Sequence, residues 1–479
     1  MPSPPRTPPV GSPANPTIRK RTINFSETSA VSDVGSRSAS LALAMQRNLA
    51  LEQKLAHEAD TLSPELALQR MLSLRSVIST TSSYAERQQG AVGQVVAFRE
   101  IGKGSIGAVY EHPGTVRCYK LPLLDDSTKL WNNYQIHTAV HEAFTNARHL
   151  DIAVRIPEMY WYANNRTSGF WEENLDKFPF TPTFPKKARD ALCMERVLPL
   201  PRPLRHLLID RYCPSDKDEA KSYGPNQDCL VRPILGRRRF GSGKIGFSLR
   251  NFRMHLDQFE ELGLDMGEYL VAMADALAVL HCQAKVDAND IEFVIGSAPL
   301  DLQSNGAYVA SADIRNMEPR TSTFELVAAK DFTNREICLW VLDFDACTTI
   351  AHDPAGVQAA VKAFMDTEPY CPRPSNNPQD EKLWKAFGNR YIYTATKLKA
   401  HPKFGPAFLG GVEAAVKTAR GIASTAAGSP AQPNFQNRIP FSGNLGRSRG
   451  RGYGRSTGGS GESVTSKGSG RDLNANWRK

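Results

Sequence analysis

The sequence has no long apolar run. No stretch of about eighteen apolar residues occurs, so a membrane span is not expected. The N-terminal residues also lack the apolar core of a secretory signal, and seven prolines among the first sixteen residues argue against an amphipathic presequence helix. We therefore expect an intracellular protein, in the cytoplasm or the nucleus, without a membrane partner.

Paired cysteines are missing as well. The eight cysteines are scattered, with no C-x-x-C pair and no Cys/His spacing typical of zinc. Several stand inside apolar, strand-like runs, such as Cys118 in VRCYK and Cys338 in ICLWVL. The sequence thus predicts reduced cysteines that pack as small hydrophobic side chains, and it predicts no zinc.

The formal net charge of +10 is placed unevenly along the chain. Residues 1–22 contribute +4, and residues 431–479 carry nine Lys or Arg against two acids, which leaves −1 for the rest. Any attraction to polyanions is therefore expected in the tails. Arginines alternate with Gly and Ser around Tyr453, so residues 438–479 are a candidate RNA-binding tail. The alternative is a solvated, flexible tail.

Composition divides the chain into four parts. Residues 1–36 are rich in Pro, Ser and Thr and have few large apolar side chains, which predicts disorder. Residues 37–91 space their apolar side chains like helices, including a short helix with Ser63 as its N-cap. A dense pattern of strands and helices fills 92–410, and the Gly/Arg-rich residues 411–479 again predict disorder.

A glycine loop follows the first strand of this domain. Residues 95–101 predict a strand, which leads into a G-x-G-x-x-G motif at Gly102, Gly104 and Gly107. A dinucleotide-binding fingerprint would open a helix here, whereas residues 108–112 continue as a strand. Protein kinases fold such a hairpin over ATP, so we predict that the three glycines bind phosphates.

The next strand ends in a lysine. Residues 116–120 predict a strand whose last residue, Lys120, stands where kinases place the lysine that binds the α- and β-phosphates. A helical stretch follows at 134–150, and Glu142 on it is the expected ion-pair partner of Lys120. Taken singly, both residues would be ordinary solvent-exposed charges. Their order after the glycine loop favours the kinase interpretation.

Two further segments fit the same layout. The strand 191–197 resembles the hinge between kinase lobes, and we expect Glu195 on it to lie next to a bound nucleotide. Further on, a helix with Asp265 as N-cap delivers His281 and the polar loop 282–290. A helix, a polar loop with Asp and Asn, and a short strand form the kinase catalytic loop.

The roles within this loop stay open. Taking Asp287 as the catalytic base makes Asn289 or Asp290 the metal ligand. Taking Asp290 as the ligand position instead puts Lys285 where the base belongs. The structural alternative is a loop whose Asp and Asn side chains simply cap backbone N–H groups.

A hydrophobic strand at 337–342 ends in Asp343 and Phe344, as in the D-F-G motif whose aspartate holds Mg²⁺. Carboxylate oxygen is a ligand that Mg²⁺ prefers, which suits Asp343. Asp345 replaces the glycine, so the kinase switch that depends on glycine is less available. An insertion, 297–336, precedes this strand, no A-P-E motif follows it, and the short helical remainder predicts a reduced C-lobe.

Several segments resemble a fungal family that is catalogued as a domain of unknown function and sometimes labelled a zinc-finger-protein domain. They are QRMLSLRSVISTTSS, CLVRPILGRRR, FSLRNFRMHLDQFEELGLD, VDANDIEFVIG, LWVLDFDAC and EPYCPRP, and they lie within 66–400. The resemblance implies a filamentous-fungal origin and a pairing of the Asp-Ala-Asn-Asp loop with the Asp-Phe loop. It implies no zinc in this chain, which has no finger motif, and it supplies no substrate.

Together these features predict an α+β protein with a divergent, two-lobe protein-kinase-like fold: a small β-rich N-lobe, a reduced helical C-lobe and disordered tails. The leading function is binding of ATP and Mg²⁺ by an atypical phosphotransferase or a pseudokinase of unknown substrate. The alternative is a non-enzymatic interaction scaffold with unidentified protein partners and an RNA-binding tail.

Overall fold

Two β-sheets organise the described part of the chain. The computed structural model describes residues 62–79, 88, 91, 96–104, 106–124, 127–180, 185–239, 247–300 and 331–426. Both sheets belong to one compact unit that ends at Arg420. The predicted disordered tail 1–36, the candidate RNA-binding tail 438–479 and residues 301–330 of the insertion lie outside the described ranges.

The five-stranded sheet carries the glycine hairpin and Lys120. Its order is β2–β3–β4–β7–β6, and all neighbours are antiparallel. The strands are β2 (Arg99–Lys103), β3 (Gly107–Glu111), β4 (Arg117–Pro122), β6 (Met159–Ala163) and β7 (Ala191–Glu195). Aromatic side chains, with Phe98 in contact with Tyr119 and Phe178, form a core of its own for this sheet.

The six-stranded sheet has the order β1–β11–β10–β8–β9, with β5 also paired to β11. The strands are β1 (Val77–Ser79), β5 (Val154–Arg155), β8 (Val231–Ile234), β9 (Phe252–His255), β10 (Glu292–Leu300) and β11 (Asp331–Leu342). Strands β10 and β11 form one long hairpin, so both ends of the segment predicted to be an insertion, 297–336, are strand. The β10–β11 pairing shifts register between Pro299 and Leu300, and proline, which has no N–H, is tolerated at such an irregularity.

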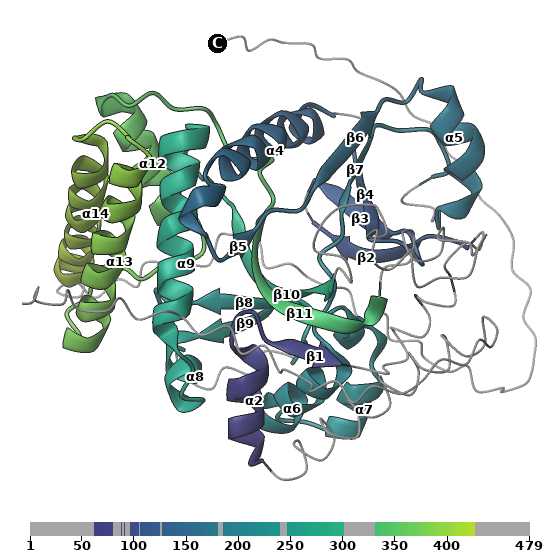
Figure 1. Cartoon of the computed structure of the whole chain (residues 1–479), viewed down its shortest axis with the longest axis horizontal. Coiled ribbons are helices and arrows are strands. Elements are labelled where there is room, and N and C mark those ends of the chain that lie inside the picture. The colour runs from purple at the N-terminus through teal and green to yellow at the C-terminus, as the bar shows by residue number, and fades with distance from the viewer. Residues whose placement is uncertain are drawn as a thin grey trace, which may run out of the picture. The chain divides into compact units, whose positions relative to one another are not determined.

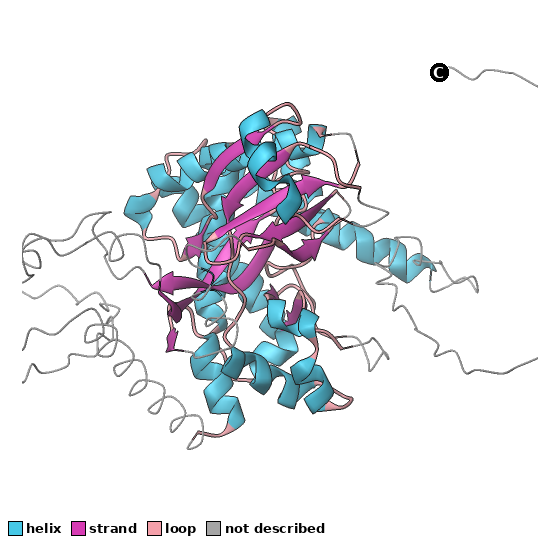
Figure 2. Ribbon diagram, turned by 90° about the vertical axis from the view of Figure 1, so that its right-hand side faces the viewer, coloured by secondary structure: helices cyan, strands magenta, loops and turns pink. Residues whose placement is uncertain are grey.

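Helices flank the sheets, as Figure 2 shows. The α-helices are α2 (Pro64–Leu72), α4 (Thr128–Asn146), α5 (Ser168–Asn174), α6 (Arg202–Tyr212), α7 (Lys217–Ser222), α8 (Leu256–Glu261), α9 (Met266–Val279), α12 (Pro354–Asp366), α13 (Pro378–Lys397) and α14 (Phe404–Ala426). Short 3₁₀ turns are η1 (Arg148–Leu150), η2 (Leu175–Lys177) and η3 (Gly224–Asp228), and a π-helical turn, η4 (Leu280–Ala284), ends α9. Helices α9, α12, α13 and α14 lie together on one flank (Figure 1).

Helix starts follow the capping residues that the sequence offers. Ser63 accepts a hydrogen bond from Leu66 N at the start of α2, as predicted. Asp265 does the same for Gly267 N at α9. Helix α4, in contrast, begins at Thr128, six residues before the predicted start. No helix in the described ranges is long and apolar enough to cross a bilayer.

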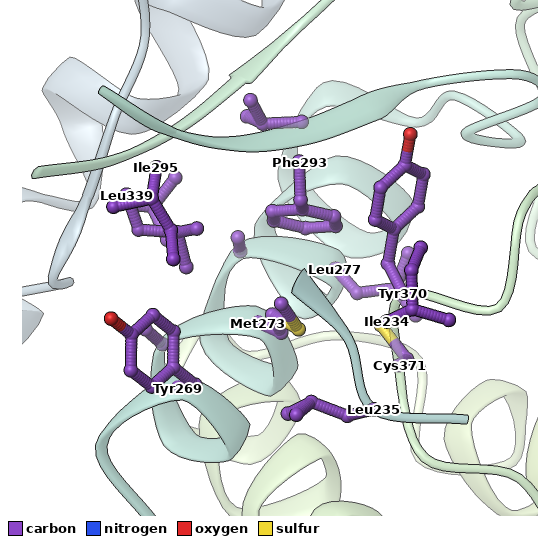
Figure 3. Close-up of a cluster of buried hydrophobic side chains, with 14 of the residues drawn as sticks. Ile234, Leu235, Tyr269, Met273, Leu277, Phe293, Ile295, Leu339, Tyr370 and Cys371 are labelled. Carbon is purple, nitrogen blue, oxygen red and sulfur yellow. The ribbon is translucent and has the colours of Figure 1, made fainter. Parts of the chain in front are cut away.

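The largest core lies between the six-stranded sheet and α9. Tyr269, Met273 and Leu277 of α9 face Phe293 and other side chains of the β10–β11 hairpin (Figure 3). These positions are buried, and each large apolar side chain contributes roughly 1.5–3 kcal/mol by leaving water. This core fixes the loop after α9 against the end of β11, where the candidate site lies.

The predicted disorder from residue 411 is wrong for its first part. Helix α14 continues to Ala426, and its Val412 and Val416 are buried. A Cβ at Gly411 would come within 2.7 Å of Val361 on α12. Gly411 therefore allows α14 to pack closely against α12. In the sequence, glycine in this region suggested a flexible tail.

Candidate functional site

Lys120 joins the two sheets. From β4 its Nζ donates to Asp343 Oδ1 at 2.7 Å and to Asp345 Oδ2 at 2.9 Å, just beyond the end of β11. The third donor contact, 3.2 Å long, goes to Asn133 Oδ1 on α4. Burial alone would lower the pKa of Lys120, but the two carboxylates outweigh it and raise that pKa above its usual range. The lysine is therefore a buried cation.

The pKa values of the two carboxyl groups are shifted in opposite directions. Burial raises the pKa of both groups, and the charge of Lys120 opposes it. For Asp343 the lysine prevails, so its pKa lies below the ordinary value. For Asp345 the pKa stays above the ordinary value, because this group also feels the charge of Asp343. Asp343 is thus the carboxylate best suited to remain ionised.

The glycine hairpin packs directly beside Lys120. Gly104 N donates to Gly107 O at 2.8 Å and closes the turn between β2 and β3. A Cβ at Gly107 would lie 2.8 Å from Leu121 O and 3.3 Å from Lys120 Cγ. At Gly102 the nearest contact would be 3.8 Å away. Gly107 is therefore required for packing, whereas a Cβ at Gly102 would make only an ordinary van der Waals contact.

Asp287 holds two loops together. Its Oδ1 accepts from Asn289 N at 3.1 Å and Thr348 N at 2.9 Å, and its Oδ2 accepts from Thr348 Oγ1 at 2.7 Å. The side chain is buried. Both oxygens are thus engaged, which favours the capping interpretation of Asp287 over the role of catalytic base.

The same loop contains strained backbone. Lys285, Ala288 and Asp290 have φ values of 55°, 58° and 58°, and Asp343 across from them has 67°. Such conformations cost about 1–3 kcal/mol each in residues other than glycine and are often found at functional sites. Here Asp290 N is held by Thr367 Oγ1 at 2.9 Å.

The loop and the end of β11 form one acidic cluster. Asn289 Nδ2 donates to Ala346 O at 3.1 Å, which leaves its Oδ1 available as an oxygen ligand. Burial raises the pKa of the Cys347 thiol, and the charges of the surrounding carboxylates raise it further. Those carboxylates are Asp287, Asp343, Asp345 and Asp290. The two loops expected to belong together are therefore in contact.

Two predicted residues make contacts other than the expected ones. Glu142 is exposed on α4, so the expected Lys120–Glu142 ion pair is wrong, and Asn133 of the same helix takes its place. Glu195 accepts from Glu158 N at 3.1 Å through its side chain, while its own N–H donates to Glu158 O at 2.7 Å. The Glu195 side chain thus fastens β7 to the start of β6.

Three site residues were missed by sequence reasoning. Asp345 was considered only as a lost glycine, and Asn133 fell before the predicted helix start. Glu292 is the first residue of β10 and forms an ion pair with Arg232. Burial raises the pKa of Glu292 to about 7, although Arg232 opposes this, and the charge of Asp343 adds to it. In the sequence, Glu292 was recognisable as a charged residue within an otherwise apolar strand.

A buried ion cluster ties the glycine hairpin to the other half of the protein. Arg99 of β2 donates to both oxygens of Asp228 at 2.8 and 2.7 Å, and to Glu111 at 2.6 Å. Arg196 contacts Glu111 and lies 3.7 Å from Asp228. Arg250 donates to Ile101 O at 2.7 Å, next to Gly102. The side chains of Asp228 and Arg250 therefore fix the glycine hairpin to the rest of the protein.

Comparison with known proteins gives one partial match. A family model described as "Zinc finger protein" is similar to residues 339–403, which include the end of β11, Asp343, α12 and α13. This description agrees with the label of the family that the sequence resembles. None of the curated proteins matches the chain.

No zinc site accompanies that description within the described residues. They contain no group of three or more His, Cys, Asp or Glu side chains placed to hold a metal ion. All eight cysteines are buried and free, as predicted. A magnesium ion needs less, because it is commonly bound by one or two carboxylates together with water and substrate phosphates. Asp343 and Asp345, with Asn289 nearby, fit that requirement.

Proposed function

We propose that this chain is a kinase-like protein that binds a magnesium–nucleoside triphosphate between the glycine hairpin and the end of β11. The contact of 2.7 Å between Lys120 Nζ and Asp343 Oδ1 carries this proposal. In protein kinases the phosphate-binding lysine on the third strand and the D-F-G aspartate face one cleft. The order of hairpin, lysine strand, helix, hinge, polar loop and aspartate supports the same two-lobe interpretation.

The residues would act as follows. The ammonium group of Lys120 lies between the two sheets, paired with Asp343 and Asp345. On nucleotide binding it would exchange these carboxylates for phosphate oxygens. Asp343 and Asp345 would hold Mg²⁺, which neutralises phosphate charge when bound. The amide oxygen of Asn289 would be a further ligand, since the Nδ2 of the same side chain donates to Ala346 O, next to Asp345. The backbone N–H groups of the glycine hairpin would bind phosphate oxygens.

We further propose that the protein is a pseudokinase. A general base must lie within hydrogen-bonding reach of the proton that it removes, and hydrogen bonds from the protein compete for its lone pairs. Both oxygens of Asp287 accept hydrogen bonds from the protein, and three of those contacts hold the loop shape. The use of Asp287 as a structural cap supports nucleotide binding without phosphate transfer.

The competing function is a non-enzymatic interaction scaffold. The observation that favours it is that Lys120 bonds to Asn133, Asp343 and Asp345 and so links the two sheets to each other. A fold stabilised in this way needs no nucleotide. The two proposals differ in whether ATP and Mg²⁺ stabilise the protein.

Thermal unfolding in millimolar ATP and Mg²⁺ separates the two. A ligand at one hundred times its Kd stabilises the native state by about 2.7 kcal/mol. We expect a rise in Tm for the wild type and for Lys129→Met, an exposed lysine of α4. We expect a smaller rise for Lys120→Met and Asp343→Asn. No rise in the wild type would favour the scaffold, and phosphate transfer at a rate above hydrolysis in buffer would refute the pseudokinase.

A further inference from the structure

The outer edge of β11 is shared by two short strands with a gap between them. Strand β1 pairs with Asn334, Arg335 and Glu336, and β5 pairs with Leu339 and Trp340. Between these pairings a hollow of about 260 Å³ opens. It is lined by Leu74, Arg75, Ile152, Ala153, Val154, Arg155, Glu336, Ile337, Cys338 and Leu339. The hollow thus lies along β11 between its two strand partners, and the residues just before β1 and β5 complete its lining.

Arg155 reaches along β11 into this gap. Its guanidinium stacks over the Trp340 ring at 5.1 Å from the centroid. Its Nη1 lies 3.7 Å from Cys338 Sγ and 3.6 Å from Glu336 Oε2. Residues 336, 338 and 340 share one face of the strand, so the side chain follows this row back toward β1. Stacking on Trp340 fixes the plane of the Arg155 guanidinium, whose N–H groups point outward in that plane.

Arg75 faces the hollow from the other side of the gap. Its backbone has a φ of 63°, a left-handed conformation that is costly for arginine. The conformation is held because Arg75 N donates to Ile337 O and Ile337 N donates to Ser76 O, both at 2.8 Å. Its guanidinium pairs with Asp151 at 3.2 Å, but Asp151 is 85% exposed. A surface pair of this kind contributes about 0–1 kcal/mol, so the guanidinium is readily shared.

The charges of the lining favour an anion. The lining contains two arginines, Arg75 and Arg155, and one carboxylate, Glu336, whose contact with Arg155 is long at 3.6 Å. Guanidinium forks match the paired oxygens of phosphate or carboxylate groups. The volume is below the range of about 300–1,000 Å³ that is typical of drug-sized ligands, so the ligand is small.

We infer that the gap between β1 and β5 is an oxyanion site for a phosphate group, held by Arg75 and Arg155. The inference does not depend on nucleotide binding, because none of these residues contacts Lys120 or Asp343. The same chemistry is offered by free inorganic phosphate and by a phosphorylated Ser or Thr side chain.

Calorimetric titration of the full chain tests the site at constant ionic strength. Inorganic phosphate and a phosphoserine peptide are the two probes, with the unphosphorylated peptide as the blank. We expect saturable binding by the wild type and by Arg166→Gln, an exposed arginine outside the hollow. Arg75→Gln and Arg155→Gln should each weaken binding at least about tenfold, the loss of one charge-assisted contact.

The outcomes are distinct. Tighter binding of the phosphopeptide than of phosphate assigns the site to a modified side chain, and equal or weaker binding assigns it to the free ion. Arg155→Lys keeps the charge and loses the fork, so it should also bind more weakly; it serves where Arg155→Gln does not fold. Binding that is equal in the wild type and all arginine variants, or absent for both probes, overturns the site.

Discussion

Replacing Lys120 by methionine removes the cation that bridges Asp343 and Asp345. The Lys120 side chain is 9% exposed and that of Asp345 is 7% exposed, so the carboxylates cannot regain full hydration. Breaking a buried ion pair by removing one partner typically costs about 3–5 kcal/mol. Asp343 is 34% exposed, which places this case at the lower end. We expect Lys120→Met to lower the free energy of unfolding by about 3 kcal/mol at pH 8.

The loss should shrink as the pH falls. In the wild type the lowered pKa of Asp343 makes its carboxylate stabilising above its ordinary pKa of about 3.9, and this is lost when the pH falls through the folded value. Without Lys120 the pKa of both carboxyls rises above that of the unfolded chain. The folded variant then binds more protons than the unfolded one, so its stability decreases with rising pH. The deficit at pH 5 is therefore smaller than at pH 8.

Denaturant unfolding of the wild type, Lys120→Met and Lys129→Met at both pH values provides the assay. Lys129 is exposed on the same helix that supplies Asn133, so its variant should stay within about 0.5 kcal/mol of the wild type. A Lys120→Met variant as stable as the control at pH 8, or a deficit that grows toward pH 5, would refute the reasoning.

Two further predictions concern the hairpin. Gly107→Ala should lower the free energy of unfolding, measured with denaturant, by about 1–3 kcal/mol, because the new Cβ would lie 2.8 Å from the backbone oxygen of Leu121. Gly102→Ala should change it by less than about 1 kcal/mol, because its nearest contact would be 3.8 Å away. Equal effects of the two variants would contradict the packing argument. Asp228→Asn should destabilise by about 3 kcal/mol and increase hydrogen exchange in β2, because Arg99 and Arg196 lose a buried counter-charge. Glu172→Gln, at an exposed position, is its control, and unchanged exchange in β2 would disprove the tether.

Local signals predicted much of the fold. The caps at Ser63 and Asp265, the lysine at the end of a strand and the aspartate after β11 were readable, because each depends on neighbours within a few residues. The α+β class follows from the order of these signals, and the contact between the two polar loops is what the family resemblance implied. The helix region from 411 was not predicted, because Gly411 is there for contact with Val361, a distant residue.

The partners within the site were harder to predict. Choosing between Glu142 and Asn133 requires the start and the rotation of α4, which lacks a side-chain cap to mark it. Nor does sequence spacing say whether a loop aspartate is free. Asp287 is engaged by Thr348, about sixty residues further along the chain. Roles that depend on which oxygens are already bonded need the folded structure.

Calorimetric titration with ATP, in the presence and absence of Mg²⁺, tests the central claim most directly. The account predicts saturable binding that requires Mg²⁺, persists in Lys129→Met, and weakens at least about tenfold in Lys120→Met and Asp343→Asn, since each removes a charge-assisted contact. No binding by the wild type at millimolar ATP, or binding of equal strength in all four proteins, would contradict it.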